Sequence, residues 1–268
     1  MNIYGIIILA TLIISFILET VADVFNLKNL KEPLPAEFEG IYGEDEYLKS
    51  QLYTSTGTKF GLISSSFSLV IMLVFWLFGG FNYIDLLVLN LTGSQNIIIN
   101  GVIYIGILII ANSIISLPFS IYSTFVIESE FGFNKTTPKT FILDLLKSLL
   151  LFVIIFVPVL ALILYLLDSG IQYAWLYGWV ILTLISLIIQ FIAPRWILPL
   201  FNKFTLLEDG ELKTAIQNYA KSVNYPVKNI FVIDGSKRSS KSNAFFTGFG
   251  KFKRIALFDT LIEKHTTD

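Results

Sequence analysis

The most informative stretch of the sequence is Gly235–Asp259, Gly-Ser-Lys-Arg-Ser-Ser-Lys-Ser-Asn-Ala-Phe-Phe-Thr-Gly-Phe-Gly-Lys-Phe-Lys-Arg-Ile-Ala-Leu-Phe-Asp. It opens as a polar, basic loop and continues into two short apolar runs, Ala244–Thr247 and Arg254–Phe258, joined by a glycine-rich turn at residues 248–251. Another apolar run, Asn229–Asp234, precedes the loop. Short apolar runs bounded by turn residues predict strands, so this part of the chain predicts three of them.

One amphipathic helix is predicted just before the strands. Its expected start is acidic, with Glu208, Asp209 and Glu211, as the positive end of a helix dipole favours. Apolar residues then recur at helical spacing, at Leu212, Ala215, Ile216, Tyr219, Ala220 and Val223. The tail therefore predicts a partial soluble α+β unit with a small antiparallel sheet. Its core would be thin for about 70 residues, so we expect the domain to continue beyond Asp268.

The rest of the chain has the composition of a membrane protein. Of its 268 residues, 54% are hydrophobic and only 15% are charged, whereas soluble domains average about 25% charged residues. A helix needs about 20 apolar residues to cross a bilayer. Five segments qualify, which predicts a mainly α, multi-pass membrane helical bundle: Ile3–Val24, Gly61–Phe81, Ile97–Phe119, Phe141–Leu167 (interrupted by Pro158) and Ile171–Ala193.

The basic residues predict how the spans are oriented. The first and third connections carry lysines, whereas the second and fourth carry none. The tail after Ala193 holds 12 of the 19 basic residues. Lysine and arginine accumulate on the cytoplasmic side of membrane proteins. We therefore expect the N-terminus to face outside and the tail to be cytoplasmic.

Composition also limits the chemistry of these residues. There is no cysteine and a single histidine, His265. A zinc site usually needs several histidine or cysteine ligands, so we interpret His265 as a surface residue near the start of a helix. A net charge of −1 gives no general attraction to nucleic acid, and we expect no nucleic-acid partner.

Two charged residues near the start of the fourth span, Asp144 and Lys147, allow two interpretations. They form either a solvated ion pair at the membrane interface or part of a polar surface lining an internal cavity, because charge at membrane depth is costly.

Several blocks of this sequence, in this order, resemble the type 1 CaaX prenyl proteases, which are integral-membrane zinc metallopeptidases. The resemblance covers the whole chain, and four ordered blocks are far more specific than one motif. The matching blocks are Phe131–Lys135, Pro199–Thr205, Glu208–Leu212 and Asp234–Leu261.

The resemblance implies a helical membrane fold around a large chamber, with a protease centre on its cytoplasmic side. In that family a helix bearing His-Glu-x-x-His follows the sheet, where the two histidines hold zinc and the glutamate activates water. That motif is not among these 268 residues. We therefore expect a membrane region at 1–199 and, at 200–268, the beginning of the cytoplasmic metallopeptidase domain, truncated before the zinc helix. We expect zinc in the full-length enzyme, and neither zinc nor activity in this fragment.

By the same resemblance, Asn243, Ala244 and Phe245 match the edge strand that binds an extended, possibly prenylated, peptide substrate. The alternative is an ordinary strand whose two phenylalanines face opposite sides. Lys237, Arg238 and Lys241 could attract a C-terminal carboxylate or lipid headgroups, or form an ordinary solvated loop.

Two departures from the family pattern suggest a bacterial-type member in an inner membrane: Lys241 stands where many eukaryotic members have histidine, and Leu206 replaces a proline. Two other functions remain open. A transporter or permease fragment would use intramembrane polar residues such as Asn100, Asn112 and Asp144 to line a pathway. A membrane-anchored peptide-binding module without chemistry would describe the chain as it stands.

Overall fold

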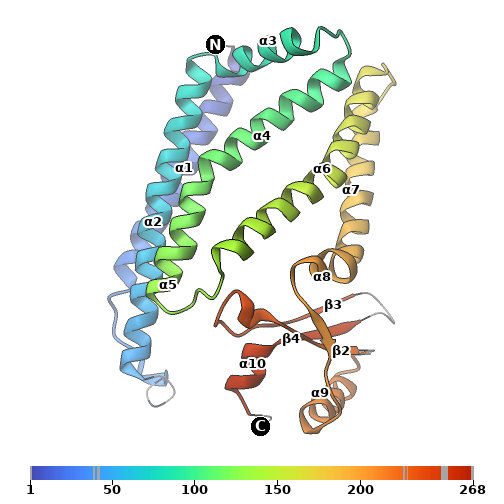
Figure 1. Cartoon of the computed structure of the whole chain (residues 1–268). Coiled ribbons are helices and arrows are strands. Elements are labelled where there is room, and N and C mark those ends of the chain that lie inside the picture. Colours follow the sequence, from blue (N-terminus) through green and yellow to red (C-terminus); the bar gives the residue numbers. More distant parts are fainter. Residues whose placement is uncertain are drawn as a thin grey trace. The chain divides into compact units, whose positions relative to one another are not determined.

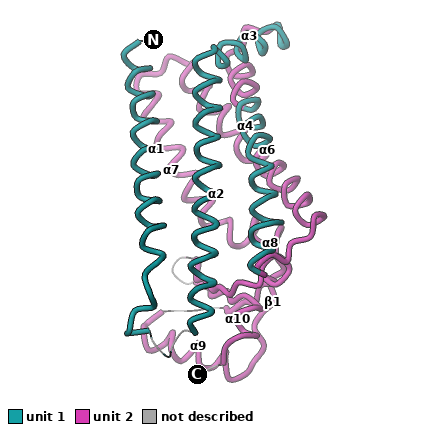
Figure 2. Tube along the Cα trace, turned by 90° about the vertical axis from the view of Figure 1, so that its left-hand side faces the viewer, with its two compact units in different colours: residues 1–93, 106–131 teal, residues 94–105, 132–268 magenta. Residues whose placement is uncertain are grey.

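The computed structural model of the chain describes residues 2–38, 40, 43–225, 227, 229–248 and 253–266. These residues form two compact units (Figure 2). The first unit comprises residues 1–93 and 106–131, and the second comprises residues 94–105 and 132–268.

The first unit is built from long helices (Figure 1). It contains α1 (Ile3–Asn29), a 3₁₀ turn at Ala36–Phe38, α2 (Glu44–Leu77) and α3 (Gly80–Thr92). Helix α4 (Ile97–Tyr122) begins in the second unit and ends in the first. It continues through a π-helical turn, η2 (Ser123–Ile127), into the short α5 (Glu128–Glu130).

Aromatic side chains join α2 to the end of α4 within this unit. The ring of Phe60 stacks on Tyr122 with 5.0 Å between centroids, and the ring of Phe67 lies 5.1 Å from Phe119. The hydroxyl of Tyr53 hydrogen-bonds to the carboxylate of Glu128. Aromatic pairs of this kind add to apolar burial, so they fix α2 against α4.

The second unit begins its long helices with α6 (Pro138–Asp168) and α7 (Ala174–Ile192). Thr137 caps α6 by accepting a hydrogen bond from the amide of Thr140, and proline is tolerated in the first turn. The predicted interruption at Pro158 is absent, because α6 runs through this proline. A tight turn containing Gly170, with φ of +67°, leads into α7.

Helix α7 does not end as a regular α-helix. It passes into a π-helical turn, η3 (Ala193–Ile197), and then into the short α8 (Leu198–Phe201). Pro194 has no N–H to donate, and a widened turn is one way in which a helix accommodates such a residue. Residues Arg195 and Trp196 both lie in this turn.

Among the described residues, five helical segments are long and apolar enough to cross a membrane, which confirms the five predicted spans. Their side chains are largely exposed, as lipid-facing surfaces are; Ile154 is 58% exposed and Leu184 is 53% exposed. The spans are longer than predicted: the second, for example, begins at Glu44 rather than at Gly61. The segments are Ile3–Asn29, Glu44–Leu77, Ile97–Glu130, Pro138–Asp168 and Ala174–Phe201.

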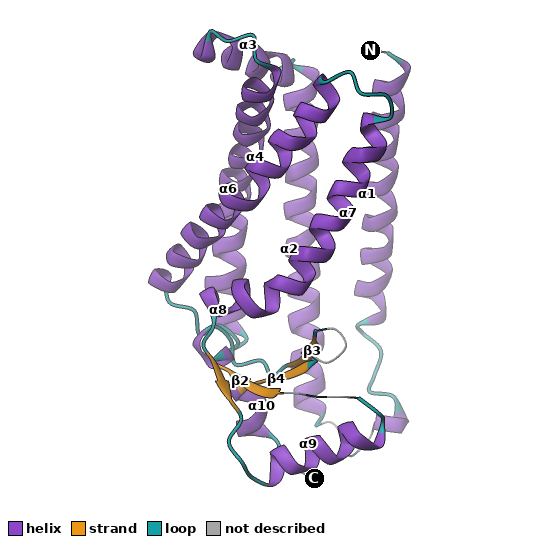
Figure 3. Ribbon diagram, turned by 90° about the vertical axis from the view of Figure 1, so that its right-hand side faces the viewer, coloured by secondary structure: helices purple, strands orange, loops and turns teal. Residues whose placement is uncertain are grey.

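A four-stranded sheet follows the last span (Figure 3). Its strands lie in the order β1-β2-β4-β3, with β1 at Phe204–Leu206, β2 at Asn229–Ile233, β3 at Ala244–Thr247 and β4 at Arg254–Phe258. The three predicted strands are present. Two of the pairings are antiparallel as expected, β1–β2 and β3–β4, but β2 and β4 pair in parallel, so the sheet is mixed.

Three short helical elements accompany the sheet: α9 (Glu211–Ser222), the 3₁₀ turn η4 (Gly235–Lys237) and α10 (Asp259–Lys264). The predicted amphipathic helix is therefore confirmed as α9. The core lies in the two central strands, where Ile230, Ile233 and Ala256 are each 2% exposed or less. The glycine-rich turn predicted at 248–251 lies mostly outside the described residues.

Candidate functional site

Strand β3 is the last strand at one end of the sheet. It pairs with β4 on one side, with Ala244 opposite Leu257 and Phe246 opposite Ile255. Among the described residues, no strand pairs with its other side. An open strand edge is a template for pairing with another extended chain.

The hydrogen bonds of the β3–β4 ladder show which backbone groups face this open edge. The amide of Phe258 donates to the carbonyl of Asn243 at 2.9 Å, which makes these two residues a hydrogen-bonded pair. In antiparallel strands such pairs alternate with pairs that do not bond to each other. The backbone groups of Ala244 and Phe246 therefore point away from β4, toward the open edge.

The three predicted substrate-binding residues lie together at the beginning of β3. Asn243 and Ala244 are exposed, and Phe245 is half-buried against Phe258 in an edge-to-face contact with 6.4 Å between ring centroids. The Oδ1 atom of Asn243 accepts a hydrogen bond from the amide of Ala244 at 2.8 Å. The Nδ2 atom makes no hydrogen bond within the described part of the chain, so it can donate to an incoming carbonyl.

Arg238, in the basic loop before β3, is engaged on all sides by this protein's own groups. Its Nε and Nη2 donate to the two carboxylate oxygens of Asp144 on α6, at 2.8 and 3.1 Å. Nη1 donates to Oδ1 of Asn202 at 2.8 Å, and Nη2 also donates to the carbonyl of Phe201 at 2.6 Å. This arginine thus joins the loop, α6 and the end of α8.

This network gives Asp144 and Lys147 a role that neither of the two interpretations included. Asp144 bonds mainly to Arg238, whereas the Lys147 ammonium lies 3.9 Å from Asp144 and donates to the carbonyl of Leu200 at 2.7 Å. The two charges belong to a structural link between span and sheet. Four of the five N–H donors of Arg238 are used in these contacts, so this arginine holds the loop against α6 and α8. Sequence reasoning missed this pair because no local pattern relates the two residues.

Two further groups of hydrogen bonds hold the basic loop. The loop after α5 contributes carbonyls to Ser240, whose amide donates to Phe133 and whose hydroxyl donates to Gly132, both at 2.9 Å. The buried hydroxyl of Thr260 on α10 donates to the carbonyl of Lys241 at 2.9 Å. The segment just before β3 is therefore held by the loop after α5 on one side and by α10 on the other.

Asp259 connects the beginning of α10 to the turn η4. Its carboxylate accepts from the amides of Ser236 and Thr260, each at 2.8 Å, and from the Ser236 hydroxyl. Burial alone would raise the pKa of Asp259, but these hydrogen bonds outweigh it and hold the pKa below its ordinary value. Asp259 is therefore a structural carboxylate whose ionised form is favoured by its hydrogen bonds.

The residues described do not by themselves fit a zinc site. They contain no group of three or more histidine, aspartate and glutamate side chains placed to hold a metal. His265 is exposed and follows the last residue of α10, at its C-terminal end rather than its start, where its amide donates to the carbonyl of Leu261 at 3.2 Å.

Comparison with known proteins identifies two family profiles in the chain. The profile described as "CAAX prenyl protease N-terminal, five membrane helices" matches residues 23–203, and "Peptidase family M48" matches residues 206–268.

Individual proteins agree with these profiles. The chain is 38% identical over 259 residues to "CAAX prenyl protease 1 homolog" of Arabidopsis thaliana, covering 94% of this chain and 61% of that protein. It is 38% identical over 245 residues to "CAAX prenyl protease 1" of Saccharomyces cerevisiae, covering 88% of this chain and 54% of that protein. The "Crystal Structure of S. mikatae Ste24p" superposes with a TM-score of 0.90 at 38% identity, covering 98% of this chain and 63% of that one.

The chain thus spans between half and two thirds of the length of these relatives. The matching profiles and the shared fold agree with the five spans and the sheet described above. This integral, multi-pass membrane protein belongs to the M48 peptidase family of CAAX prenyl proteases.

Proposed function

We propose that this chain supplies the membrane region and the peptide-docking strand of a zinc endopeptidase that cleaves near the C-terminus of membrane-associated or prenylated peptides. The main observation behind this proposal is the open edge of β3, where the backbone groups of Ala244 and Phe246 face outward. Addition of a strand to such an edge is a recurring way to bind an extended peptide. The relatives named as prenyl proteases supply the substrate class.

Asn243, Ala244 and Phe245 have distinct roles in this proposal. Ala244 offers an outward amide and a small side chain that lets the peptide approach closely. Asn243 accepts from that amide in the structure and turns away when the peptide pairs there, while its Nδ2 donates to a peptide carbonyl. Phe245 packs against Phe258 and fixes the strand.

The proposal divides the chain into a membrane region at residues 1–199 and the beginning of the peptidase domain at residues 200–268, on the cytoplasmic side. The meeting of the two family profiles between residues 203 and 206 supports this boundary. The distribution of basic residues supports the orientation. The relatives named above are eukaryotic and give no support to a bacterial inner membrane.

Zinc belongs to the complete enzyme in this proposal, and these 268 residues alone neither hold it nor cleave peptides. The single histidine and the lack of cysteine support this statement. Metal analysis of the purified chain should find less than stoichiometric zinc, and one tightly held zinc per chain would contradict it.

Replacement of Ala244 by proline tests the docking role. Proline removes the outward N–H but leaves the bonds between β3 and β4 intact, because Ala244 does not bond to β4. We expect binding of a fluorescent farnesylated peptide to the purified chain to weaken about 2- to 10-fold, the value of one hydrogen bond. Ala244→Ser, which keeps the N–H, should bind normally. Equal binding by both variants would remove β3 from the site.

A further inference from the structure

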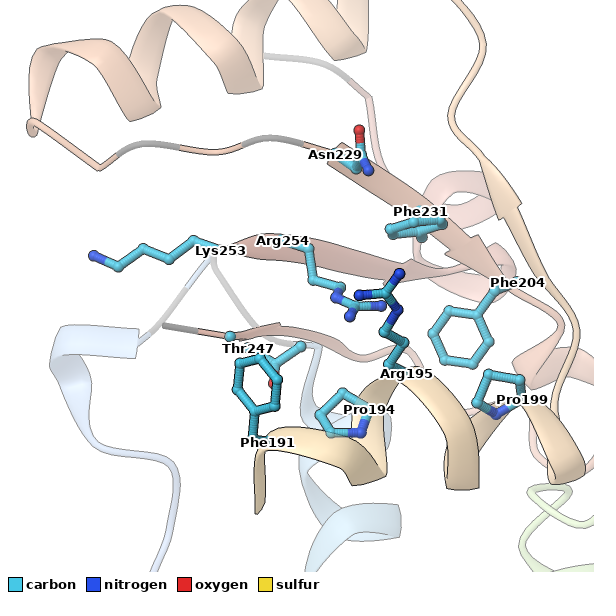
Figure 4. A pocket seen from close by; sticks show the side chains of 11 residues that line it. Phe191, Pro194, Arg195, Pro199, Phe204, Asn229, Phe231, Thr247, Lys253 and Arg254 are labelled. Carbon is cyan, nitrogen blue, oxygen red and sulfur yellow. The ribbon is translucent and has the colours of Figure 1, made fainter. Parts of the chain in front are cut away.

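A second candidate site lies between the π-helical turn η3 and one face of the sheet (Figure 4). It is a cavity of about 370 Å³, within the size range of small-ligand sites. Its walls come from the end of α7, η3, α8 and all four strands. Phe191, Pro194, Pro199, Phe204 and Phe231 supply its apolar surface.

Two arginines approach each other across this cavity. Arg195 extends from η3 and Arg254 from the beginning of β4, and their guanidinium groups face one another (Figure 4). Neither side chain forms an ion pair or hydrogen bond with any described residue, and no carboxylate is among the residues lining the cavity. Burial and the neighbouring Arg195 lower the pKa of Arg254. Two like charges held together in this way favour an anion between them.

The other side chains that line the cavity suit an anion that comes from outside the protein. Asn229 and Thr247 place neutral polar groups in the lining. The guanidinium of Arg254 lies 5.7 Å from the centre of the Phe231 ring, which supports its planar group from one side. Lys253 extends away from the arginines and lies over the ring of Tyr225 at 4.2 Å, adding positive charge at the edge of the cavity.

The position of the cavity indicates where the anion comes from. The η3 turn lies within the last candidate span, Ala174–Phe201, near its C-terminal end. Trp196, beside Arg195, is 70% exposed, and tryptophan and arginine at the end of a span mark the headgroup region of a bilayer. The cytoplasmic leaflet carries anionic lipids that attract basic residues next to a span.

We propose that Arg195 and Arg254 bind the phosphate of an anionic lipid headgroup in this cavity. The site lies on the face of the sheet and does not involve the outward backbone groups of β3. It therefore does not depend on peptide binding or cleavage, and it would fix the sheet at the surface of the membrane.

Calorimetric titration of the purified chain with dihexanoyl phosphatidylglycerol tests the proposal. We expect saturable binding that weakens about 10-fold in Arg195→Gln and in Arg254→Gln, because each loses a charge-assisted contact. Lys221→Gln, which removes an exposed charge from α9, should leave the affinity unchanged. Arg195 is exposed, so its variant should fold; a normal elution volume in size-exclusion chromatography would verify this.

Titration with three further ligands distinguishes a lipid headgroup from other sources of the anion. Dihexanoyl phosphatidylcholine should bind more weakly than phosphatidylglycerol, and inorganic phosphate and an acetylated tripeptide with a free carboxylate should bind more weakly still. Equal binding of inorganic phosphate would overturn the lipid assignment, and tighter binding of the peptide would replace it with a peptide carboxylate. Unchanged lipid affinity in both arginine variants would overturn the site itself.

Discussion

Arg238 and Asp144, 94 residues apart in the chain, form a bidentate ion pair that links the basic loop to the fourth candidate span. The Arg238 and Asp144 side chains are 22% and 23% exposed. The same arginine donates to Asn202 and to the carbonyl of Phe201. A single guanidinium therefore determines how the sheet is attached to α6 and α8.

Loss of this pair should destabilise the chain. We expect Arg238→Ala to lower the free energy of unfolding by about 2–3 kcal/mol, because it leaves Asp144 and two carbonyl-type acceptors unpaired. Arg238→Lys should restore only part of this free energy, since a lysine ammonium lacks the planar geometry that lets arginine donate to both carboxylate oxygens at once. The measurement is denaturant unfolding in detergent.

A surface ion pair gives the matched control for this prediction. Lys213 lies 2.7 Å from Asp209, whose side chain is 95% exposed. Exposed pairs contribute at most about 1 kcal/mol, so Lys213→Gln should change stability little. Equal effects of Arg238→Ala and Lys213→Gln would mean that the network around Arg238 is not structural.

Gly235 has no room for a larger residue. A Cβ added there would lie 2.4 Å from Cδ2 of Phe258 and 3.0 Å from its Cγ. We expect Gly235→Ala to cost about 1–3 kcal/mol of stability through overpacking. Gly210→Ala is the control, because nothing lies within 4 Å of its added Cβ. A stable Gly235→Ala protein would show that the Phe258 ring moves freely.

Replacement of Asn243 should affect turnover but not the metal in a complete enzyme that carries this sequence. If Nδ2 of Asn243 holds a peptide carbonyl, Asn243→Ala loses about one hydrogen bond, or up to about 10-fold in kcat/KM. Zinc content should remain one per chain, which distinguishes a docking role from a collapsed site. Unchanged kinetics would contradict the role proposed for this residue.

Because of the hydrogen bonds of Asp259, we expect the free energy of unfolding to depend on pH in the acidic range. Its pKa is lower in the folded chain, so its contribution is present above the unfolded pKa of about 3.9 and is lost as pH falls through the folded value. Ser236→Ala should move the Asp259 pKa back toward its ordinary value. NMR titration of the Asp259 carboxyl carbon measures this shift, and identical titrations in both proteins would rule out control by Ser236.

Cysteine labelling tests the orientation, and it is convenient because the natural sequence has no cysteine. Glu46→Cys places an exposed thiol in the first turn of α2, next to the first connection, and Gln95→Cys places one in the connection between α3 and α4. In intact cells a membrane-impermeant reagent should label residue 95, and should label residue 46 only after permeabilisation. The reverse pattern would invert the proposed topology.

The sequence predicted those elements that leave a local pattern. Hydropathy located all five spans, and short apolar runs located β2, β3 and β4. Helix α3 was missed because Gly80–Thr92 is too short for a span and contains several polar residues. Strand β1 was missed because only pairing with β2 makes its three residues a strand.

Features that depend on distant residues could not be predicted in the same way. The parallel pairing of β2 with β4 depends on a connection that runs through η4 and β3. The engagement of Arg238 by Asp144 and the approach of Arg195 to Arg254 each join segments far apart in the chain. The predicted edge strand, by contrast, has an open edge, because β3 is the last strand of the sheet in the part of the chain that the structure describes.

The π-helical turn at Ala193–Ile197 has a consequence for how this segment tolerates insertions and deletions. Each residue added to or removed from a helix rotates the remainder of that helix by about 100°. Such a rotation would carry Arg195 away from the sheet and present a different side chain to it, even if the segment stayed equally apolar. The number of residues in this turn, and not its hydrophobicity alone, therefore determines which side chains of the last span face the sheet.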